Sequence, residues 1–175
     1  MKPWINCYIG LGSNLDNPLQ QVTDAIQHLS QHPHLRTIKA STLYSSKPVG
    51  PQDQPDFINA VAQLQTQLGP HDLLDVLQSI EQAHHRKRLR HWGERSLDLD
   101  LLLYGQSQIQ TPRLTVPHAL MLERSFVLYP LAELCPERLL PNGQLLKDHL
   151  SRIPFDLSPI TSSAASQNRR VFCQR

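Results

Sequence analysis

The clearest sign of chemistry in this chain is a pair of aspartates separated by one residue. Apolar and acidic residues alternate from Leu97 to Leu101, and successive side chains of a strand point to opposite faces. Asp98 and Asp100 are therefore predicted to share one face of a strand. Adjacent carboxylates repel each other, and their hard oxygen atoms are the ligands that Mg²⁺ prefers. An isolated Asp-x-Asp more often lies on a solvated strand face, so the neighbouring sequence must decide between these two interpretations.

A basic cluster comes immediately before this strand. Its members are Arg86, Lys87, Arg88, Arg90 and Arg95, interrupted by Trp92 and Gly93. Arginine and lysine bind phosphate groups, whereas carboxylates bind the cation that accompanies a nucleotide. Acids on a rigid strand beside a basic loop therefore predict a site for a magnesium-nucleotide complex.

A second candidate binding surface follows a long loop. Residues 45–56 include three prolines and a glycine, and loops of this length inside compact domains tend to be functional. Strict alternation after the loop places Phe57 and Asn59 together on one face, at the mouth of the loop. An aromatic ring beside an amide suits a flat heteroaromatic ligand, although such a pair on its own is usually structural.

Length, charge and cysteine content narrow the class of protein. A chain of 175 residues is long enough for one domain with its own hydrophobic core. The formal net charge of +2 gives no support to a broad nucleic-acid surface or a polybasic membrane anchor. Cys7, Cys135 and Cys173 are too widely spaced for a disulfide framework. With no apolar segment long enough for a signal peptide or a membrane span, we expect a cytoplasmic protein.

The elements that must position these residues alternate between strands and helices. Period-two patterns predict strands over 4–10, 37–44, 57–68 and 97–101. One helix is predicted from Pro18, with Asn17 as its cap, to before Pro33, and another from Pro70 onward, with Gln78 and Glu81 on its polar side. Shorter helices are predicted over 120–124, 126–134 and 144–152. The segment from Gly10 to Asn14 is predicted to be a tight turn, with only weak resemblance to a phosphate-binding loop.

This order of elements predicts the fold class. Strand, helix, two strands, helix and strand form an α+β sandwich of the ferredoxin-like type, with a mainly antiparallel sheet and helices packed on it. The extra short helices are expected near the C-terminus. Residues 1–157 are predicted to form a single domain, and 158–175 to form a poorly ordered tail because Ser, Ala, Gln and Arg dominate there.

Five blocks of sequence, taken in order, are typical of one enzyme family. Residues 91–102 read basic-x-Gly-x-Arg-x-x-Asp-x-Asp followed by apolar residues. The other blocks are 8–15, 49–59, 113–118 and 123–128. Through them nearly the whole chain, up to about Phe155, resembles the 6-hydroxymethyl-7,8-dihydropterin pyrophosphokinase family of folate biosynthesis.

The resemblance implies a reaction and a set of site residues. The reaction is transfer of the terminal diphosphate of ATP to the hydroxymethyl group of the pterin, with release of AMP. Asp98 and Asp100 would hold two Mg²⁺ ions, and Arg86 and Arg95 would act with them in catalysis. The implied ATP-binding residues are Gln78, Glu81, Arg86, Arg88, Trp92, Arg95, Leu101, Arg113, Thr115, His118 and Arg124. The implied pterin-binding residues are Ser46, Lys47, Val49, Phe57, Asn59 and Phe126.

The chain departs from the family pattern at a few positions. His85 precedes Arg86 where many members have glycine, and the basic loop looks one residue shorter than in well-known bacterial members. Either Arg86 or Arg88 could therefore make the main phosphate contact. Glu94 stands where proline is usual, and Ala119 where some members have tyrosine. None of these positions belongs to the acidic pair or the expected pterin pocket.

Two other classes of protein share the predicted fold. An RNA-binding module would present aromatic residues amid a wide basic surface, whereas the acidic pair here would repel phosphate unless a metal intervened. A non-catalytic ATP sensor could keep every nucleotide contact, but the expected pterin-binding residues argue against it. We expect a monomer that binds ATP and the pterin and has no nucleic-acid or membrane partner.

Overall fold

The computed structural model describes residues 1–84 and 91–161. In chain order the elements are β1 (Ile5–Ser13), α1 (Pro18–Gln31), β2 (Leu35–Ala40), β3 (Tyr44–Ser46), β4 (Phe57–Thr66), α2 (Pro70–Ala83), β5 (Asp98–Tyr104), β6 (Ile109–Gln110), β7 (Thr115–Val116), α3 (Ser125–Leu134), α4 (Leu146–Leu150) and β8 (Ser158–Pro159). No helix among the described residues is both long and apolar enough to cross a membrane.

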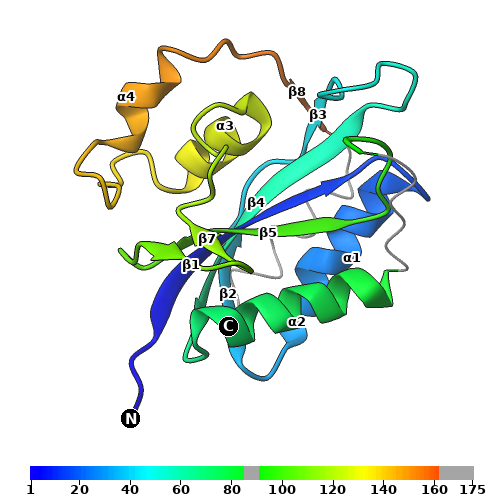
Figure 1. Cartoon of the computed structure of the whole chain (residues 1–175). Coiled ribbons are helices and arrows are strands. Elements are labelled where there is room, and N and C mark those ends of the chain that lie inside the picture. Colours follow the sequence, from blue (N-terminus) through cyan, green and yellow to red (C-terminus); the bar gives the residue numbers. More distant parts are fainter. Residues whose placement is uncertain (85–90, 162–175) are drawn as a thin grey trace.

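A six-stranded antiparallel sheet forms the centre of the molecule (Figure 1). Its strands follow the order β5-β1-β4-β3-β8, and β2 also pairs with β4. Helices α1 and α2 cover one face of the sheet, while α3 and α4 lie on the other (Figure 1). The predicted α+β fold, an antiparallel sheet with helices packed on it, is confirmed.

Alternation along the strands divides the apolar residues between two cores. Cys7, Ile9 and Leu64 belong to the core under α1 and α2, whereas Tyr8 and Val61 belong to the core under α3 and α4. The second core fills only one end of its face. Towards the other end the same face carries glycine and polar side chains, and this is where the site lies.

A bulge in β5 sets which way its side chains point. Tyr8 of β1 is paired with Leu103 and the next residue, Ile9, with Leu101, so Leu102 is the extra residue. A bulge of this kind changes the phase of the alternation. Before it, Leu99 and Leu101 enter the core under α1 and α2. After it, Leu103 enters the core on the opposite face.

The predicted strand over 37–44 is two strands. Both β2 and β3 pair with β4, and the break between them falls at Ser41. The backbone N–H of Ser41 donates to the Val61 carbonyl (2.8 Å), while the Val61 N–H donates to the Ser41 hydroxyl (2.9 Å). A side-chain oxygen replaces a backbone carbonyl here, which allows the chain to change direction without leaving the Val61 N–H unsatisfied.

Three further expectations about local structure are wrong. Strand β1 continues to Ser13 instead of turning at Gly10, because both of its edges are paired over this stretch. Asn17 precedes α1 with a positive φ of 64° and makes no side-chain cap. Residues 119–123 form turns where a short helix was predicted.

The C-terminal part of the chain is ordered beyond the predicted boundary at 157. Ser158 and Pro159 form β8, which pairs with Ser45 and Tyr44 of β3. The N–H of Ile160 also donates to the Leu43 carbonyl at 2.8 Å. The remainder of the expected tail, 162–175, lies outside the described residues.

Leu64 tests the core under α1 and α2. Its side chain, near the C-terminal end of β4, is 0% exposed. Leu64→Ala should lower the free energy of unfolding by about 2–5 kcal/mol because it removes buried methyl groups and leaves a cavity. Urea unfolding measures this, with Ile38→Ala as the control because Ile38 is 41% exposed. Equal losses for the two variants would contradict the packing described here.

Candidate active site

Two glycines of β1 form the floor of a pocket on the face under α3. Gly10 is paired with Asp100 and Gly12 with Asp98, while on the other side Gly12 is paired with Asn59 of β4. A Cβ atom at Gly12 would lie 3.2 Å from Oδ1 of Asn59. The missing side chains therefore leave open space between the acidic strand and the amide.

The alternation of residues in β1 could have predicted this glycine floor. Gly10 and Gly12 continue the alternation of β1, so they share a face with Tyr8. The prediction of a turn treated each glycine as a breaker. In a strand, however, glycine also marks a place where a ligand approaches the backbone closely.

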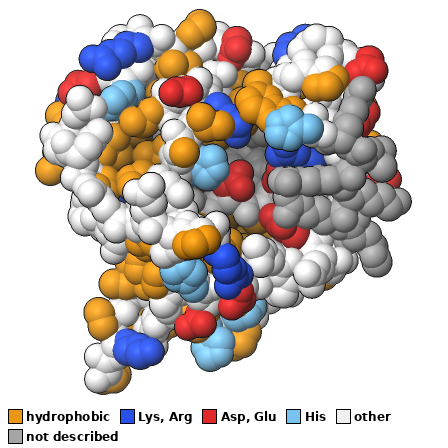
Figure 2. All heavy atoms as spheres, in the orientation of Figure 1, with side chains coloured by type: hydrophobic (Ala, Val, Ile, Leu, Met, Phe, Trp, Pro, Cys, Tyr) orange, Lys and Arg blue, Asp and Glu red, His pale blue; other side chains and the backbone are white. Residues whose placement is uncertain are grey.

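The acidic pair lies at one end of this floor. Asp98 is buried and Asp100 is half-buried, and Arg95 forms an ion pair with Oδ2 of Asp98. Burial and the neighbouring Asp98 carboxylate raise the pKa of Asp100, while His118, Arg95 and Arg124 act in the opposite direction. The pair is thus a concentration of negative charge that arginines balance only in part. In Figure 2 acidic, basic and histidine side chains gather near a hollow in the middle of the visible face.

The donor set of this pair fits a magnesium ion that a substrate helps to bind. Among the described residues, no group of three or more His, Cys, Asp or Glu side chains could hold a metal ion. Mg²⁺ does not need such a cage, because it is commonly held by one or two carboxylates together with substrate phosphates and water. Asp98 and Asp100 supply these two carboxylates from one rigid strand face.

An aromatic end completes the pocket. Phe57 comes from the start of β4 and Phe126 from the first turn of α3, and both line the pocket. The amide of Asn59 donates to the Ser46 hydroxyl at 2.7 Å, which fixes its orientation. Arg124 lies 5.7 Å from the ring centroids of both Phe126 and Trp92, so its charge is held between the two ends.

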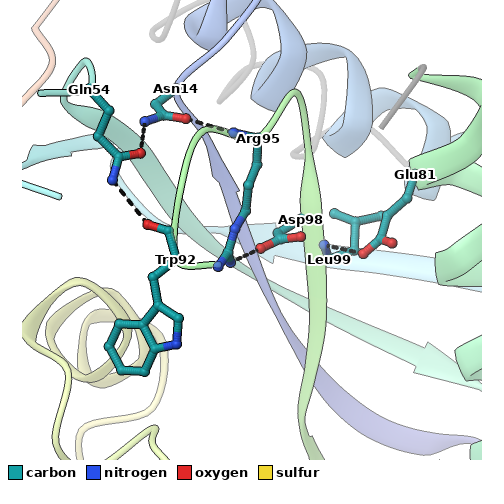
Figure 3. Close-up of polar contacts among 7 residues, drawn as sticks. All are labelled: Asn14, Gln54, Glu81, Trp92, Arg95, Asp98 and Leu99. Atoms are coloured by element: carbon teal, nitrogen blue, oxygen red, sulfur yellow. Dashed lines mark hydrogen bonds and ion pairs between the residues drawn. The ribbon is translucent and has the colours of Figure 1, made fainter. Parts of the chain in front are cut away.

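Buried polar contacts hold the segment that leads into β5 (Figure 3). Asn14 accepts a hydrogen bond from the Arg95 N–H at 2.8 Å and donates to Gln54, which in turn donates to the Trp92 carbonyl. Neither Asn14 nor Gln54 was predicted as a site residue. Their residue types did not indicate such a role, because asparagine and glutamine are common in loops. Only the fold shows that they are buried together.

Most of the predicted pterin and phosphate residues converge on this one pocket. Those that line it are Ser46, Lys47, Val49, Phe57, Asn59, Trp92, Arg95, Asp98, Asp100, Arg124 and Phe126. The predictions for Arg86 and Arg88 lie outside the described residues.

The remaining predicted nucleotide residues lie elsewhere. Leu101 is buried in the core on the opposite face. Arg113 pairs with Asp75 (2.6 Å) and contacts Gln78 (3.3 Å) beside α2. Two more predicted residues line a second, more open hollow next to the β6–β7 hairpin, and these are Thr115 and His118.

Glu81 has a different place from the one that its helix position suggested. Its position on α2 predicted a polar, outward-facing side chain, but it is only 4% exposed. Its Oε1 accepts a hydrogen bond from the Leu99 N–H at 2.8 Å (Figure 3). Leu99 lies between the two aspartates, so Glu81 supports the strand that carries them.

The fold and the pocket are those of an α+β protein whose binding site has an acidic and an aromatic end. Carboxylates face a glycine floor, arginines stand beside them, and an aromatic recess lies within the same cavity. The class of protein follows from comparison with known proteins. The family model described as 7,8-dihydro-6-hydroxymethylpterin-pyrophosphokinase (HPPK) matches residues 8–136, and the chain belongs to this family.

Individual relatives agree with this assignment. The chain is 51% identical over 144 residues to a protein of Haemophilus influenzae, covering 82% of this chain and 90% of that one. It is 49% identical over 149 residues to a protein of Pseudomonas aeruginosa, covering 85% and 92%. Both are named 2-amino-4-hydroxy-6-hydroxymethyldihydropteridine pyrophosphokinase.

A solved structure shows the same fold at low sequence identity. The wild-type HPPK-DHPS of Plasmodium falciparum with pteroate superimposes with a TM-score of 0.70 and 14% identity. The match covers 87% of this chain and 43% of that chain, so this chain spans less than half of the longer protein.

Removing one charge from the acidic pair should stabilise the metal-free protein. Because the pKa of Asp100 is raised on folding, the folded state holds that proton more tightly than the unfolded chain. Stability is therefore lost as the pH rises from the unfolded pKa through the folded one. Asp100→Asn should have a higher urea midpoint than wild type at neutral pH in EDTA, and Mg²⁺ should raise the midpoint of the wild type only.

The control for this experiment is Asp24→Asn on α1, outside the pocket. It should leave the urea midpoint and its response to Mg²⁺ unchanged. A lower midpoint for Asp100→Asn in EDTA would mean that the two carboxylates do not repel each other as described.

Proposed function

We propose that this chain transfers the diphosphate of ATP to the hydroxymethyl group of 6-hydroxymethyl-7,8-dihydropterin, releasing AMP, with Mg²⁺ held by Asp98 and Asp100. Membership of the family makes it a pyrophosphokinase of folate biosynthesis. The observation that carries the residue assignment is that a carboxylate pair and an aromatic-amide recess share one pocket. Such a pocket can hold a polyphosphate and a flat acceptor side by side.

The aromatic end suits the pterin. Phe57 and Phe126 offer ring faces against which a planar heterocycle can stack. Asn59, oriented by its bond to Ser46, presents an amide that can both donate to and accept from the edge of the pterin ring. Lys47 and Val49, in the loop after β3, close the outer side of this recess.

The acidic end suits the triphosphate. The resemblance implies two Mg²⁺ ions, which would neutralise charge on the phosphates when bound between Asp98, Asp100 and the nucleotide. Arg95 keeps Asp98 in place through their ion pair, and its guanidinium is positioned to contact phosphate oxygens as well. Arg124 adds positive charge between the nucleotide and the pterin. These groups orient the substrate hydroxyl and the β-phosphorus for in-line attack.

The proposal also includes a path for the adenosine part of ATP. We place Gln78, Arg113, Thr115 and His118 along the path of the adenosine, beyond the edge of β5. The N–H of His118 donates to the Leu102 carbonyl at 3.0 Å, which ties this region to the acidic strand. The same proposal takes the chain as a single-domain cytoplasmic monomer whose partners are its small-molecule substrates. The nearly balanced charge of +2 gives no support to a nucleic-acid or membrane partner.

Incubation of the purified chain with ATP, Mg²⁺ and the pterin alcohol should yield AMP and the pterin diphosphate. Asp98→Ala and Asp100→Ala should each lower turnover by several orders of magnitude, because each removes a ligand of the cation that stabilises the transferring phosphates. Chromatography of the nucleotides gives the rates, and circular dichroism checks that the variants are folded. Near-normal turnover in either variant would disprove the metal assignment.

Phe126→Ala should weaken pterin binding by about tenfold while changing ATP binding much less, because a stacking contact of order 1 kcal/mol or more is lost. Isothermal calorimetry measures both affinities. The control is Phe155→Ala, since Phe155 is 57% exposed and contacts Tyr44 and Tyr129 outside the pocket. Equal losses for pterin and ATP in Phe126→Ala would contradict the stacking role.

A further inference from the structure

The turn between α3 and α4 carries an asparagine followed by a glycine (Figure 1). Asn142-Gly143 is the only such pair in the sequence. Both residues are exposed, and a Cβ atom added to Gly143 would meet no other atom of the described residues within 4 Å. The pair therefore lies at an open tip, where a side chain can approach the main chain freely.

Main-chain hydrogen bonds close this turn. The N–H of Gly143 donates to the Leu140 carbonyl at 2.9 Å, and the N–H of Leu140 donates to the Gln144 carbonyl at 2.8 Å. Gly143 has a positive φ of 83°, which glycine adopts at little cost. The conformation of the turn thus requires glycine after Asn142, and glycine is the residue that leaves its peptide nitrogen most accessible.

The hydrogen bonds of the Asn142 side chain favour attack on its amide carbon. Its Oδ1 accepts from the Gln144 N–H at 3.0 Å, and its Nδ2 donates to Oε1 of Gln144 at 3.2 Å. When a nucleophile attacks Cγ, negative charge develops on Oδ1. A hydrogen-bond donor that already points at this oxygen stabilises that charge.

We propose that Asn142 is a site of spontaneous modification, at which the chain converts its own asparagine to aspartate and isoaspartate. The Gly143 nitrogen loses its proton to hydroxide and forms a bond to Cγ of Asn142, while the bond from Cγ to Nδ2 breaks and ammonia leaves. Proximity within one chain favours this ring closure. Water then opens the cyclic imide at either of its carbonyl groups. One opening gives aspartate, and the other gives isoaspartate, in which the main chain runs through Cγ.

Two other exposed asparagines of the chain lack the conditions for this reaction. Asn17 is followed by Pro18, whose nitrogen carries no proton to lose. Asn6 is followed by Cys7 within β1, and Cys7 is paired with neighbouring strands on both sides. These residues share the exposure of Asn142 without its glycine neighbour, so they serve as internal controls.

The modification changes the wall of the second hollow. Asn142 lines this hollow together with Thr115 and His118. Either product adds a negative charge there, and isoaspartate also lengthens the main chain of the turn by one carbon atom. The effect on ligand binding rests on the proposed function, which places the adenosine of ATP along Thr115 and His118. Because ATP is a polyanion, the modified chain should bind it more weakly.

Peptide mapping by mass spectrometry tests the modification. The purified protein is held at mildly alkaline pH, and each asparagine is followed by the mass gained when an amide becomes a carboxyl group. Asn142 should convert at least about tenfold faster than Asn6 or Asn17. An isoaspartyl methyltransferase, which labels isoaspartate alone, counts one of the two products independently. Asn142→Gln should abolish both signals at this position, because glutamine would have to close a larger ring.

The chain unfolded in urea provides the reference rate. The hydrogen bond from the Gly143 N–H to the Leu140 carbonyl must open before the nitrogen can attack, and local opening costs little at an exposed tip. The native rate at Asn142 should therefore lie within about tenfold of the rate in urea. A native rate lower than this would show that the fold protects Asn142, and a native rate no higher than those at Asn6 and Asn17 would show that glycine gives no advantage. Either result would overturn the inference.

Calorimetry with Mg²⁺ and α,β-methylene-ATP, which resists diphosphate transfer, tests the effect on binding. Fully modified wild type should bind the nucleotide about two- to fivefold more weakly than fresh wild type, as expected for one added surface charge. Asn142→Gln held under the same conditions should keep its affinity. Unchanged affinity in the modified wild type, or an equal loss in Asn142→Gln, would overturn this effect. Fresh wild type that binds no nucleotide would instead overturn the proposed function, whereas the mass measurement would still decide the modification.

Discussion

Repulsion between two carboxylates on one face of a strand is the constraint on which this site depends. Asp98 and Asp100 cannot move apart, because β1 pairs with β5 on one side and Glu81 binds the Leu99 N–H on the other. Burial, together with the neighbouring Asp98 carboxylate, raises the pKa of Asp100, and this shift reflects the free-energy cost of holding the pair in place. The pair lowers the stability of the fold, and in return this end of the pocket has a high affinity for positive charge. The arginines around the pair reduce the cost without removing the demand for a cation.

The pocket exists because one of the two cores stops before the end of the sheet. Under α1 and α2 the apolar residues run the length of the strands, from Cys7 to Leu11 on β1. Under α3 the same strands change from Tyr8 to Gly10 and Gly12, and from Val61 to Asn59. Alternation thus lets one set of strands be a core on one side and a binding surface on the other. Helix α3 contributes Phe126 at the border between the two regions.

Sequence patterns predicted the parts of the site that lie on regular elements. Alternation was enough to pair Asp98 with Asp100 and Phe57 with Asn59, because a strand leaves no choice of face. It could not show that Gly10 and Gly12 continue a strand, since glycine has no side chain with which to mark a face. Contacts between distant loops, such as those of Asn14 and Gln54, depend on tertiary structure alone. Glu81 was assigned to the solvent side of its helix because helical spacing does not show that the Leu99 N–H, on a neighbouring strand, needs a hydrogen-bond acceptor.

The bulge at Leu102 gives β5 two halves with opposite phase. The first half delivers acids to the pocket, and the second delivers a leucine to the core on the same side of the sheet. The number of residues in this strand is therefore constrained more tightly than their identity. A leucine of this strand could be replaced by another apolar residue of similar size. A single insertion or deletion before the bulge, however, would exchange acids for leucines on both faces at once. Natural variants of this strand should therefore differ in the identity of residues and conserve their number.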